Sequence, residues 1–395
     1  MARVLSNRKA VDGLFLLALG AALLALVLYP SQAVEAARSG WELCCSVIIP
    51  SLFPFFVLSS LCVELGLVRY LSLAMERFMQ PLFGVNGACA PAFALGIIGG
   101  YPVGARTAIS LYEKRYISKD ETERLLAFCN NCGPAFILGV AGASVFHSSG
   151  AGLLLYGAHI AASVLVGVLM KPRGKGRRSV RTAAAPVPGQ PVSFASAFTG
   201  CVKDSFFATL GICAFVTFFT VVVRMLFLTG LMTAAASALA WVLGRFGLTA
   251  DLAQRLLIGV IELSSGVWSL ADAAGSLPGR LSMAAFILGW AGLSVHCQVL
   301  SFLGSTGLRV RTYLAGKLLH GLFSAALVWG LTRLLPLREP VAVYLAREVS
   351  GLASMNFSAA LTASTVAAGC VWLVVMAICL GMMAKEAFHR RRNVV

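Results

Sequence analysis

Long apolar runs recur along the whole chain, and short polar segments separate them. A helix needs about 20 predominantly apolar residues to cross the hydrocarbon core of a bilayer. Seven runs reach or approach this length, namely Gly13–Tyr29, Val47–Val68, Gly152–Met170, Ser205–Leu228, Leu281–Leu303, Tyr313–Leu335 and Val366–Met383. The pattern predicts an all-α polytopic membrane protein with about 8–10 transmembrane helices, including broken helices and re-entrant hairpins, in two halves.

Composition and charge placement agree with a lipid environment. Only 12% of the 395 residues are charged and 58% are apolar, which leaves too few charges for the polar surface of a water-soluble protein. The net charge of +16 gathers in short segments beside apolar runs, at Arg3–Lys9, Lys171–Arg181 and Lys385–Arg392. Lys and Arg accumulate in cytoplasmic loops and attract anionic headgroups. This placement favours membrane anchoring over a nucleic-acid site.

A basic, Pro- and Gly-rich segment at residues 171–191 divides the chain and is predicted to be a cytoplasmic linker. It separates a first membrane half, residues 1–170, from a second, residues 192–395. If both termini and the linker are cytoplasmic, each half crosses the membrane an even number of times. Four crossings fit the first half when Pro91–Val103 is a re-entrant hairpin. In the second half, Thr229–Leu243 and Leu281–Leu303 can each span or re-enter.

Each half also contains interrupted apolar segments with short shared patterns. Ala92–Gly99 and Ala285–Gly292 both follow A-F-x-L-G-x-x-G, and Arg-Leu-Leu opens an apolar helix at Arg124 and at Arg255. The two pieces occur in opposite order in the two halves, so a simple tandem duplication does not explain them. Paired, interrupted apolar segments are nevertheless the best sequence pointer to the central site of a transporter.

The polar break in Leu125–Gly139 is the sharpest of these interruptions. Asn130, Asn131, Gly133 and Pro134 lie in the middle of an otherwise apolar run, and Pro134 removes a backbone donor. Broken backbone at membrane depth survives only where protein or a water-filled cavity surrounds it. The amides are therefore candidates for binding a polar solute. The alternative is a Pro-kinked helix whose two Asn side chains hold it to a neighbour.

A second break runs from Gly99 through Gly100 and Tyr101 to Ala105, and a helix begins near Arg106. The exposed N–H groups and partial positive charge of a helix N-terminus suit an anion, and Arg106 adds a full charge. The alternative is a tight loop at the membrane surface, with Arg106 extended toward the headgroups.

The third break follows Ala285–Gly292, where Ser294, His296 and Gln298 alternate with apolar residues. This alternation predicts an extended hairpin tip that presents the three polar groups to one side. A lone embedded histidine is more often a helix contact than a proton carrier, but its polar neighbours make His296 a binding candidate.

Glu262 is the strongest single ionisable residue, because a charge at the centre of a spanning helix is costly and marks a functional site by default. We expect it to couple transport to a proton or cation. A structural ion pair between Glu262 and Arg224 is the alternative. Nothing in the sequence resembles a catalytic nucleophile, a metal motif or a cofactor loop, so no enzyme, metal or cofactor is expected.

At the three broken segments the chain resembles the YlbJ-type sporulation integral membrane proteins, also called stage V sporulation protein SpoVV. The motifs are GGYPVGA at 99–105, FCNNCGPAFILG at 128–139 and GLSVHCQV at 292–299, and the likeness covers about residues 10–385. That family belongs to the Gate, or nucleoside-recognition, group, which also includes concentrative nucleoside transporters, ferrous iron transporters and spore maturation proteins. Relatives more often have Ser at the position of Cys132, which is therefore not counted as a site residue.

The resemblance implies a transporter of a small anionic solute, dipicolinic acid, across the outer forespore membrane during sporulation. Its expected partners are that solute, the lipid bilayer and a coupling proton or cation. The expected binding residues are Gly100, Tyr101, Arg106, Asn130, Asn131, Gly133, Ser294, His296 and Gln298. Alternatives are a nucleoside or cation transporter of the same group, and a membrane assembly protein that transports nothing.

Overall fold

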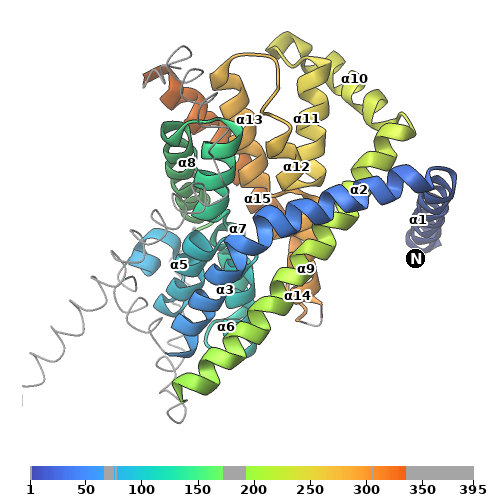
Figure 1. The fold of residues 1–395 in the computed structure, drawn as a ribbon. Coiled ribbons are helices and arrows are strands. Elements are labelled where there is room, and N and C mark those ends of the chain that lie inside the picture. The colour runs from blue at the N-terminus through green and yellow to red at the C-terminus, as the bar shows by residue number, and fades with distance from the viewer. Residues whose placement is uncertain (1, 66–74, 76–77, 172–192, 305, 335–395) are drawn as a thin grey trace, which may run out of the picture.

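The computed structural model describes residues 2–65, 75, 78–171, 193–304 and 306–334, and every regular element among them is helical. Within this part of the chain four stretches are long and apolar enough to cross a membrane: Ser149–Leu169, Phe194–Leu228, Leu277–Leu303 and Val310–Leu334. An all-α polytopic membrane fold is therefore confirmed (Figure 1). The predicted span Val366–Met383 and almost the whole predicted linker lie outside the described residues.

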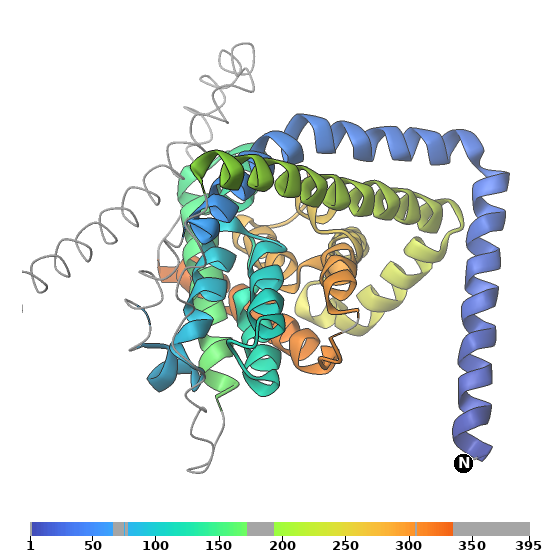
Figure 2. The same ribbon diagram turned by 90° about the horizontal axis from the view of Figure 1, so that it is seen from below.

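The N-terminal helices form an outer arm around the bundle. Helix α1 (Ala2–Leu28) ends at Tyr29, and α2 (Pro30–Leu43) follows at an angle of 98°. Figure 2 shows α1 standing apart from the bundle, and leucines along its outer half are exposed. Helix α2 instead packs along α9 (Phe194–Leu228), which also contacts α3 (Ile49–Glu64). A short π-helix, η1 (Cys44–Ile48), joins α2 to α3.

The first half is built from a hairpin, a broken span and one continuous helix. After the short turns η2 (Met79–Phe83) and η3 (Gly87–Cys89), helices α5 (Ala90–Gly99) and α6 (Val103–Glu113) fold back on each other. Helix α7 (Lys119–Cys129) begins with a capping box at Ser118 and is separated from the π-helix η4 (Ala135–Val145) by an unwound segment. Helix α8 (Ser149–Leu169) follows. A helical hairpin, α5–α6, therefore occupies the region where a re-entrant hairpin at Pro91–Val103 was predicted, and its re-entry into the membrane stays a prediction.

The second half repeats this order of hairpin, broken span and continuous helix. Helix α9 leads into α10 (Leu231–Leu243), which is too short to span, and the turn η5 (Gly244–Phe246). Helices α11 (Ala250–Ile261) and α12 (Leu263–Trp268) form the second hairpin. Helices α13 (Leu277–Trp290) and α14 (Gly292–Leu303) form the second broken span, and α15 (Val310–Leu334) completes the described chain. In Figure 1 the α5–α6 hairpin lies below and the α11–α12 hairpin above.

The shared sequence patterns do not mark equivalent elements. The two copies of A-F-x-L-G-x-x-G fall in α5, the first arm of a hairpin, and in α13, the first part of a broken span. The two Arg-Leu-Leu pieces fall in α7, part of a broken span, and in α11, part of a hairpin. Each shared pattern therefore lies in the hairpin of one half and in the broken span of the other. This explains why the two patterns occur in opposite order in the two halves.

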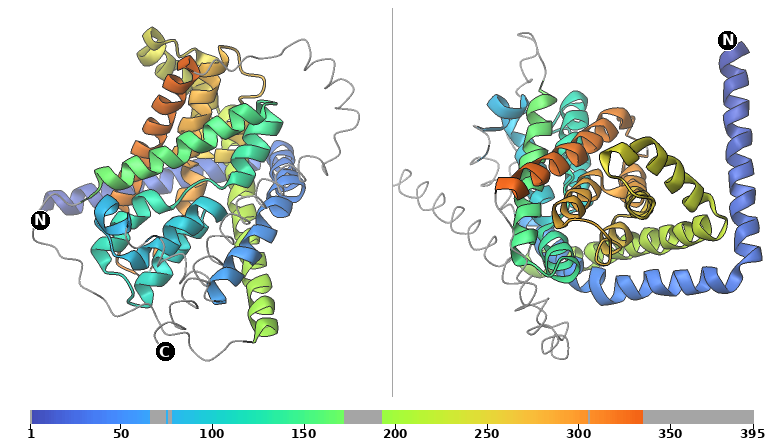
Figure 3. Two further views of the ribbon diagram at one scale, coloured as in Figure 1. Left: turned by 90° about the vertical axis from the view of Figure 1, so that its left-hand side faces the viewer. Right: turned by 90° about the horizontal axis from the view of Figure 1, so that it is seen from above.

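Helix α15 is the central contact between the halves. It packs against α13 of its own half and against α7 and α8 of the first half (Figure 3). Glycines make these contacts close: a Cβ at Gly289 would lie 2.6 Å from the Cα of Gly321, and one at Gly316 would lie 2.6 Å from the carbonyl oxygen of Ala127. Because lipid offers no hydrophobic driving force between helices, such small-residue packing contributes much of their association.

We predict that Gly316→Ala destabilises the protein, whereas Gly330→Ala in the same helix does not. The new methyl at position 316 would meet the backbone of Ala127, and overpacking of this kind costs about 1–3 kcal/mol. No atom lies within 4 Å of a Cβ at Gly330, so there the alanine only improves helix propensity. Thermal unfolding of the detergent-purified variants measures the difference, and equal midpoints would contradict the close approach of α15 to α7.

Candidate functional site at four helix breaks

Each half brings its two helix breaks into backbone contact. In the first half, a Cβ at Gly100, whose φ is +79°, would lie 2.7 Å from the nitrogen of Gly133. In the second half, a Cβ at Gly292, whose φ is +74°, would lie 2.9 Å from the nitrogen of Leu263. The left-handed conformation and the lack of space both require glycine at these two positions. The unwound segments therefore stack in pairs.

Three of the breaks, together with the helix that starts after the fourth, border one cavity. The α5–α6 break contributes Tyr101, the α7–η4 break contributes Cys132 and Gly133, and the α11–α12 break contributes Glu262. Helix α14, which starts directly after the fourth break, contributes Ser294 and Gln298. Ser264 of α12 and apolar side chains from η1, α3, η4, α9, α12 and α14 complete the lining: Ile48, Leu52, Phe136, Ile212, Val216, Leu263 and Val295.

The structure places the predicted site residues in three groups. Five of them line the cavity: Tyr101, Gly133, Glu262, Ser294 and Gln298. Four others are buried but do not belong to its lining: Gly100, Asn130, Asn131 and His296. Arg106 is exposed on α6 and does not line the cavity, an arrangement that fits the alternative of a surface-facing arginine.

The prediction of an extended hairpin tip at Gly292–Gln298 is wrong, because this segment opens helix α14. In a helix, residues four apart share a face and residues two apart do not. Ser294 and Gln298 accordingly line the cavity together, and the Ser294 hydroxyl has no protein partner. His296 instead lies 2.9 Å from the hydroxyl of Tyr313 on α15, through its Nδ1 atom.

Side chains of the break itself and of neighbouring helices bond the backbone groups freed at the first-half breaks. The Asn131 amide donates to the carbonyl of Phe128 at 3.1 Å, and the backbone N–H of Cys132 donates to Nε2 of His159 at 2.9 Å. Tyr156 donates to the carbonyl of Ile97 at 3.4 Å, at the end of α5. Unwound backbone in a membrane needs such partners, since no water replaces them.

Lys317 of α15 is buried completely at the centre of this arrangement. Its ammonium donates to the hydroxyl of Tyr101 at 2.8 Å and to the carbonyl of Asn130 at 2.9 Å. It also lies 3.2 Å from Nδ1 of His320, whose Nε2 is 2.9 Å from a backbone carbonyl, that of His159. A carbonyl only accepts, so Nε2 of His320 carries the ring proton and Nδ1 accepts from Lys317. All three ammonium protons are thus bound by neutral acceptors.

Tyr101 links Lys317 to the second half of the protein. Its hydroxyl donates to the carbonyl of Leu288 on α13 at 2.7 Å and therefore accepts from Lys317 with a lone pair. The hydrogen bonds of one side chain thus join the break of the first hairpin to α13 and α15.

Sequence reasoning missed Lys317, His159 and His320. The signal was present, because Lys317 and His320 are polar residues inside the predicted span Tyr313–Leu335, the same feature that singled out Glu262. Their spacing of three places them on one helical face with Tyr313 and Ser324, and all four are fully buried. His159 lies in the middle of an apolar helix, α8, and could have been found in the same way.

Glu262 lies at the third break, where it caps α12. Its carboxylate accepts from the backbone N–H of Ser264 at 3.0 Å and of Ser265 at 2.6 Å. Trp290 donates to the carbonyl of Val260 just before the break, at 3.1 Å. Arg224 is exposed on α9, and Glu262 makes no ion pair with it. The alternative of a structural pair between these two residues is therefore not observed.

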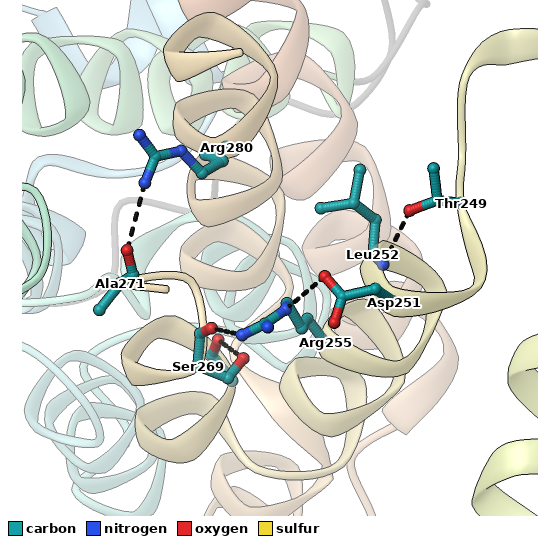
Figure 4. Close-up of polar contacts among 8 residues, drawn as sticks. Thr249, Asp251, Leu252, Arg255, Ser269, Ala271 and Arg280 are labelled. Carbon is teal, nitrogen blue, oxygen red and sulfur yellow. Dashed lines mark hydrogen bonds and ion pairs between the residues drawn. The ribbon is translucent and has the colours of Figure 1, made fainter. Parts of the chain in front are cut away.

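Polar contacts at the far end of the second hairpin hold its arms in place (Figure 4). Arg255 of α11 pairs with Asp251 at 2.8 Å and donates to the carbonyl of Ser269, beyond the end of α12. Arg280 of α13 donates to the carbonyl of Ala271 at 3.2 Å. Thr249 caps the start of α11. These contacts fix the connection between α12 and α13 and so position Glu262.

We predict that cysteine introduced at Ser294 or Gln298 reacts with a small water-soluble thiol reagent, whereas cysteine at His296 does not. The first two positions line the cavity, and the third is turned toward Tyr313. The measurement is the labelling rate in a variant whose native cysteines have been replaced. Equal labelling at all three positions would indicate an extended segment instead of a helix.

Comparison with known proteins agrees with this fold and with the helix breaks of the first half. The Gate family model, described as nucleoside recognition, matches residues 45–146, which include both breaks of the first half. A structure of CNTnw in an inward-facing substrate-bound state is similar over 81% of this chain and 85% of its own, with a TM-score of 0.50 and 15% identity, and so shares the fold. The sporulation integral membrane protein YlbJ of Bacillus subtilis (strain 168) is 30% identical over 319 residues, covering 77% of this chain and 78% of its own. This chain belongs to the YlbJ family of sporulation integral membrane proteins.

Proposed function

We propose that this chain is a membrane transporter that carries a small anionic solute, dipicolinic acid, across the outer forespore membrane. The observation that carries the proposal is one cavity bordered by three helix breaks and by α14, which starts at the fourth break. Transporters bind their substrates near the bilayer midplane, between discontinuous helices of two repeats. Matching breaks in both halves allow the halves to open the cavity alternately to either side.

The chemistry of the cavity suits a planar aromatic dicarboxylate. Apolar side chains such as Phe136 and Ile212 offer walls for an aromatic ring. The Ser294 hydroxyl lacks a protein partner, and Gln298 lies one helical turn away. Small-molecule sites combine mostly apolar linings with a few polar groups in this way. The substrate itself is inferred from the resemblance to the sporulation family, and membership of that family supports a role in sporulation.

Glu262 is the proposed coupling residue. It lies on the cavity as a carboxylate, and a bound proton or cation there would remove the repulsion between Glu262 and an incoming anion. Binding of the two ligands would then be mutually favourable, as coupled transport requires.

A nucleoside is the second candidate substrate, because the matching family model is described as nucleoside recognition. A neutral nucleoside also needs apolar walls and a few hydrogen-bonding groups. The third hypothesis is a membrane assembly protein that transports nothing. In that case replacement of the cavity residues would not affect function.

Counterflow in liposomes containing only the purified protein separates these candidates. We predict exchange of labelled dipicolinate well above that of protein-free liposomes, and no exchange of uridine or adenosine. Exchange of nucleosides alone would support the second candidate, and absence of any exchange would favour the assembly role.

We predict that Ser294→Ala raises the KM for dipicolinate roughly 10- to 100-fold with little change in protein yield. A hydrogen bond to a charged group contributes about 1.5–3 kcal/mol, and this hydroxyl has no other partner. Ser163→Ala is the matched control, because that buried hydroxyl bonds within its own helix to Ile160. An unchanged KM in the Ser294 variant would remove this residue from the binding site.

We predict that Glu262→Gln abolishes gradient-driven accumulation of dipicolinate but preserves its exchange at equilibrium. Glutamine keeps one oxygen for capping α12, yet it does not bind a proton or cation as a carboxylate does. Accumulation driven by proton and sodium gradients is compared with counterflow in the same vesicles. Loss of both activities would assign Glu262 to folding or substrate binding, and loss of neither would exclude a coupling role.

A further inference from the structure

The amino group of Lys317 has three hydrogen-bond acceptors, as an ammonium requires, and no described carboxylate beside it. Its three hydrogen bonds go to the Tyr101 hydroxyl, the Asn130 carbonyl and the His320 ring, all of them neutral. Among the residues that the structure describes, Lys317 is the only fully buried lysine or arginine. A buried charge is retained at high cost unless an opposite charge compensates it.

The buried carboxylates of the described chain are all engaged elsewhere. Glu121 accepts from the backbone of Asn86 and Ser118, and Glu123 accepts from the backbone of Arg309, both near the start of α7. Glu262 accepts two backbone N–H groups at the N-terminus of α12, where the helix dipole already favours a negative charge. Glu262 is thus held by backbone N–H groups and forms no ion pair with Lys317.

The charge of Lys317 is close to the cavity although its side chain does not line it. Tyr101 connects them, because it both lines the cavity and accepts a hydrogen bond from the ammonium. In an environment of low dielectric constant a unit charge acts strongly over such short distances. The ammonium also orients the Tyr101 hydroxyl, whose proton goes to Leu288.

We propose that Lys317 is the positioning residue that makes the cavity selective for anions: the negative charge of the bound solute is its missing counter-ion. This inference rests on the proposed function and names the residue that distinguishes an anion from a neutral solute of the same shape. Lys317 acts through Tyr101 and through the electrostatic potential of the cavity, without direct contact with the solute.

The competing explanation is structural, since Lys317 also supports the carbonyl of Asn130 at a helix break. The two roles differ in what they do to selectivity. A structural support stabilises the site for every ligand, whereas a fixed charge affects only charged ligands.

The test uses purified full-length protein and two probes of similar shape, the dianion dipicolinate and the neutral pyridine-2,6-dicarboxamide. Their affinities are measured by calorimetry for wild type, Lys317→Gln and Lys317→Arg. Glutamine can still donate to the Asn130 carbonyl but carries no charge, and arginine keeps the charge. We expect Lys317→Gln to weaken dipicolinate binding by 10-fold or more and to leave the diamide within about 2-fold, whereas Lys317→Arg retains the preference for dipicolinate.

Parallel weakening of both probes in Lys317→Gln would identify Lys317 as a structural support and overturn the proposal. Unchanged dipicolinate affinity would also overturn it. In both cases wild-type binding and counterflow of dipicolinate leave the proposed function standing. If wild type itself neither binds nor exchanges dipicolinate, the proposed function fails and the inference fails with it.

Should Lys317→Gln not fold, the second variant is Tyr101→Phe, which removes the hydroxyl between Lys317 and the cavity. We expect it to reduce the preference for the dianion over the diamide, and an unchanged preference would refute the proposal.

Discussion

The structure depends on one constraint: every backbone group freed where a helix breaks inside the bilayer must find a partner within the protein. Side chains provide these partners at each break. Tyr156 serves the carbonyl at the end of α5, Asn131 and Lys317 serve carbonyls of the α7–η4 break, and His159 accepts from its N–H. In the second half Trp290 and Glu262 do the same beside α12, and Tyr101 reaches the carbonyl of Leu288. The first role of polar side chains at membrane depth is thus to provide hydrogen-bond partners for the backbone. Any role in transport comes in addition to this structural role.

This constraint also explains why the breaks converge. Several of these side chains come from adjacent helices, such as Tyr156, His159 and Lys317, so the breaks lie where several helices meet. Helix α15 fills that position, and its glycines allow α7 and α13 to approach closely enough for Lys317 to reach both Tyr101 and Asn130. Stacking of the paired breaks at Gly100 and Gly292 then leaves a cavity between the halves. Close packing and the polar cavity are two results of the same arrangement.

The sequence predicted the membrane class, the first hairpin and the polar break at Asn130–Pro134, because each rests on a local pattern of apolar residues, glycine and proline. It failed at Gly292–Gln298, where alternating polarity indicated an extended segment. The alternation arises because Ser294 and Gln298 face the cavity while His296 faces Tyr313, so two polar environments lie on different sides of one helix. It also overlooked Lys317, since a single charge in a long apolar run is visible in the sequence, but its partners come from segments more than 180 residues away. Long-range pairing of this kind follows from packing and not from any local pattern.

Glu262 and Lys317 show why burial alone does not identify the charge that acts on a solute. Glu262 lies at a helix break, Lys317 lies in the continuous helix α15 beside another break, and both are almost completely buried. The carboxylate of Glu262 is held by two N–H groups at a helix N-terminus, where the local dipole offsets its charge. The acceptors around Lys317 offer partial charges from a hydroxyl, a carbonyl and an imidazole, which bind the ammonium without cancelling its charge. In the proposed anion transporter, Glu262 is the candidate for exchanging a proton or cation, and Lys317, which has no described carboxylate partner, is the candidate for attracting the anion.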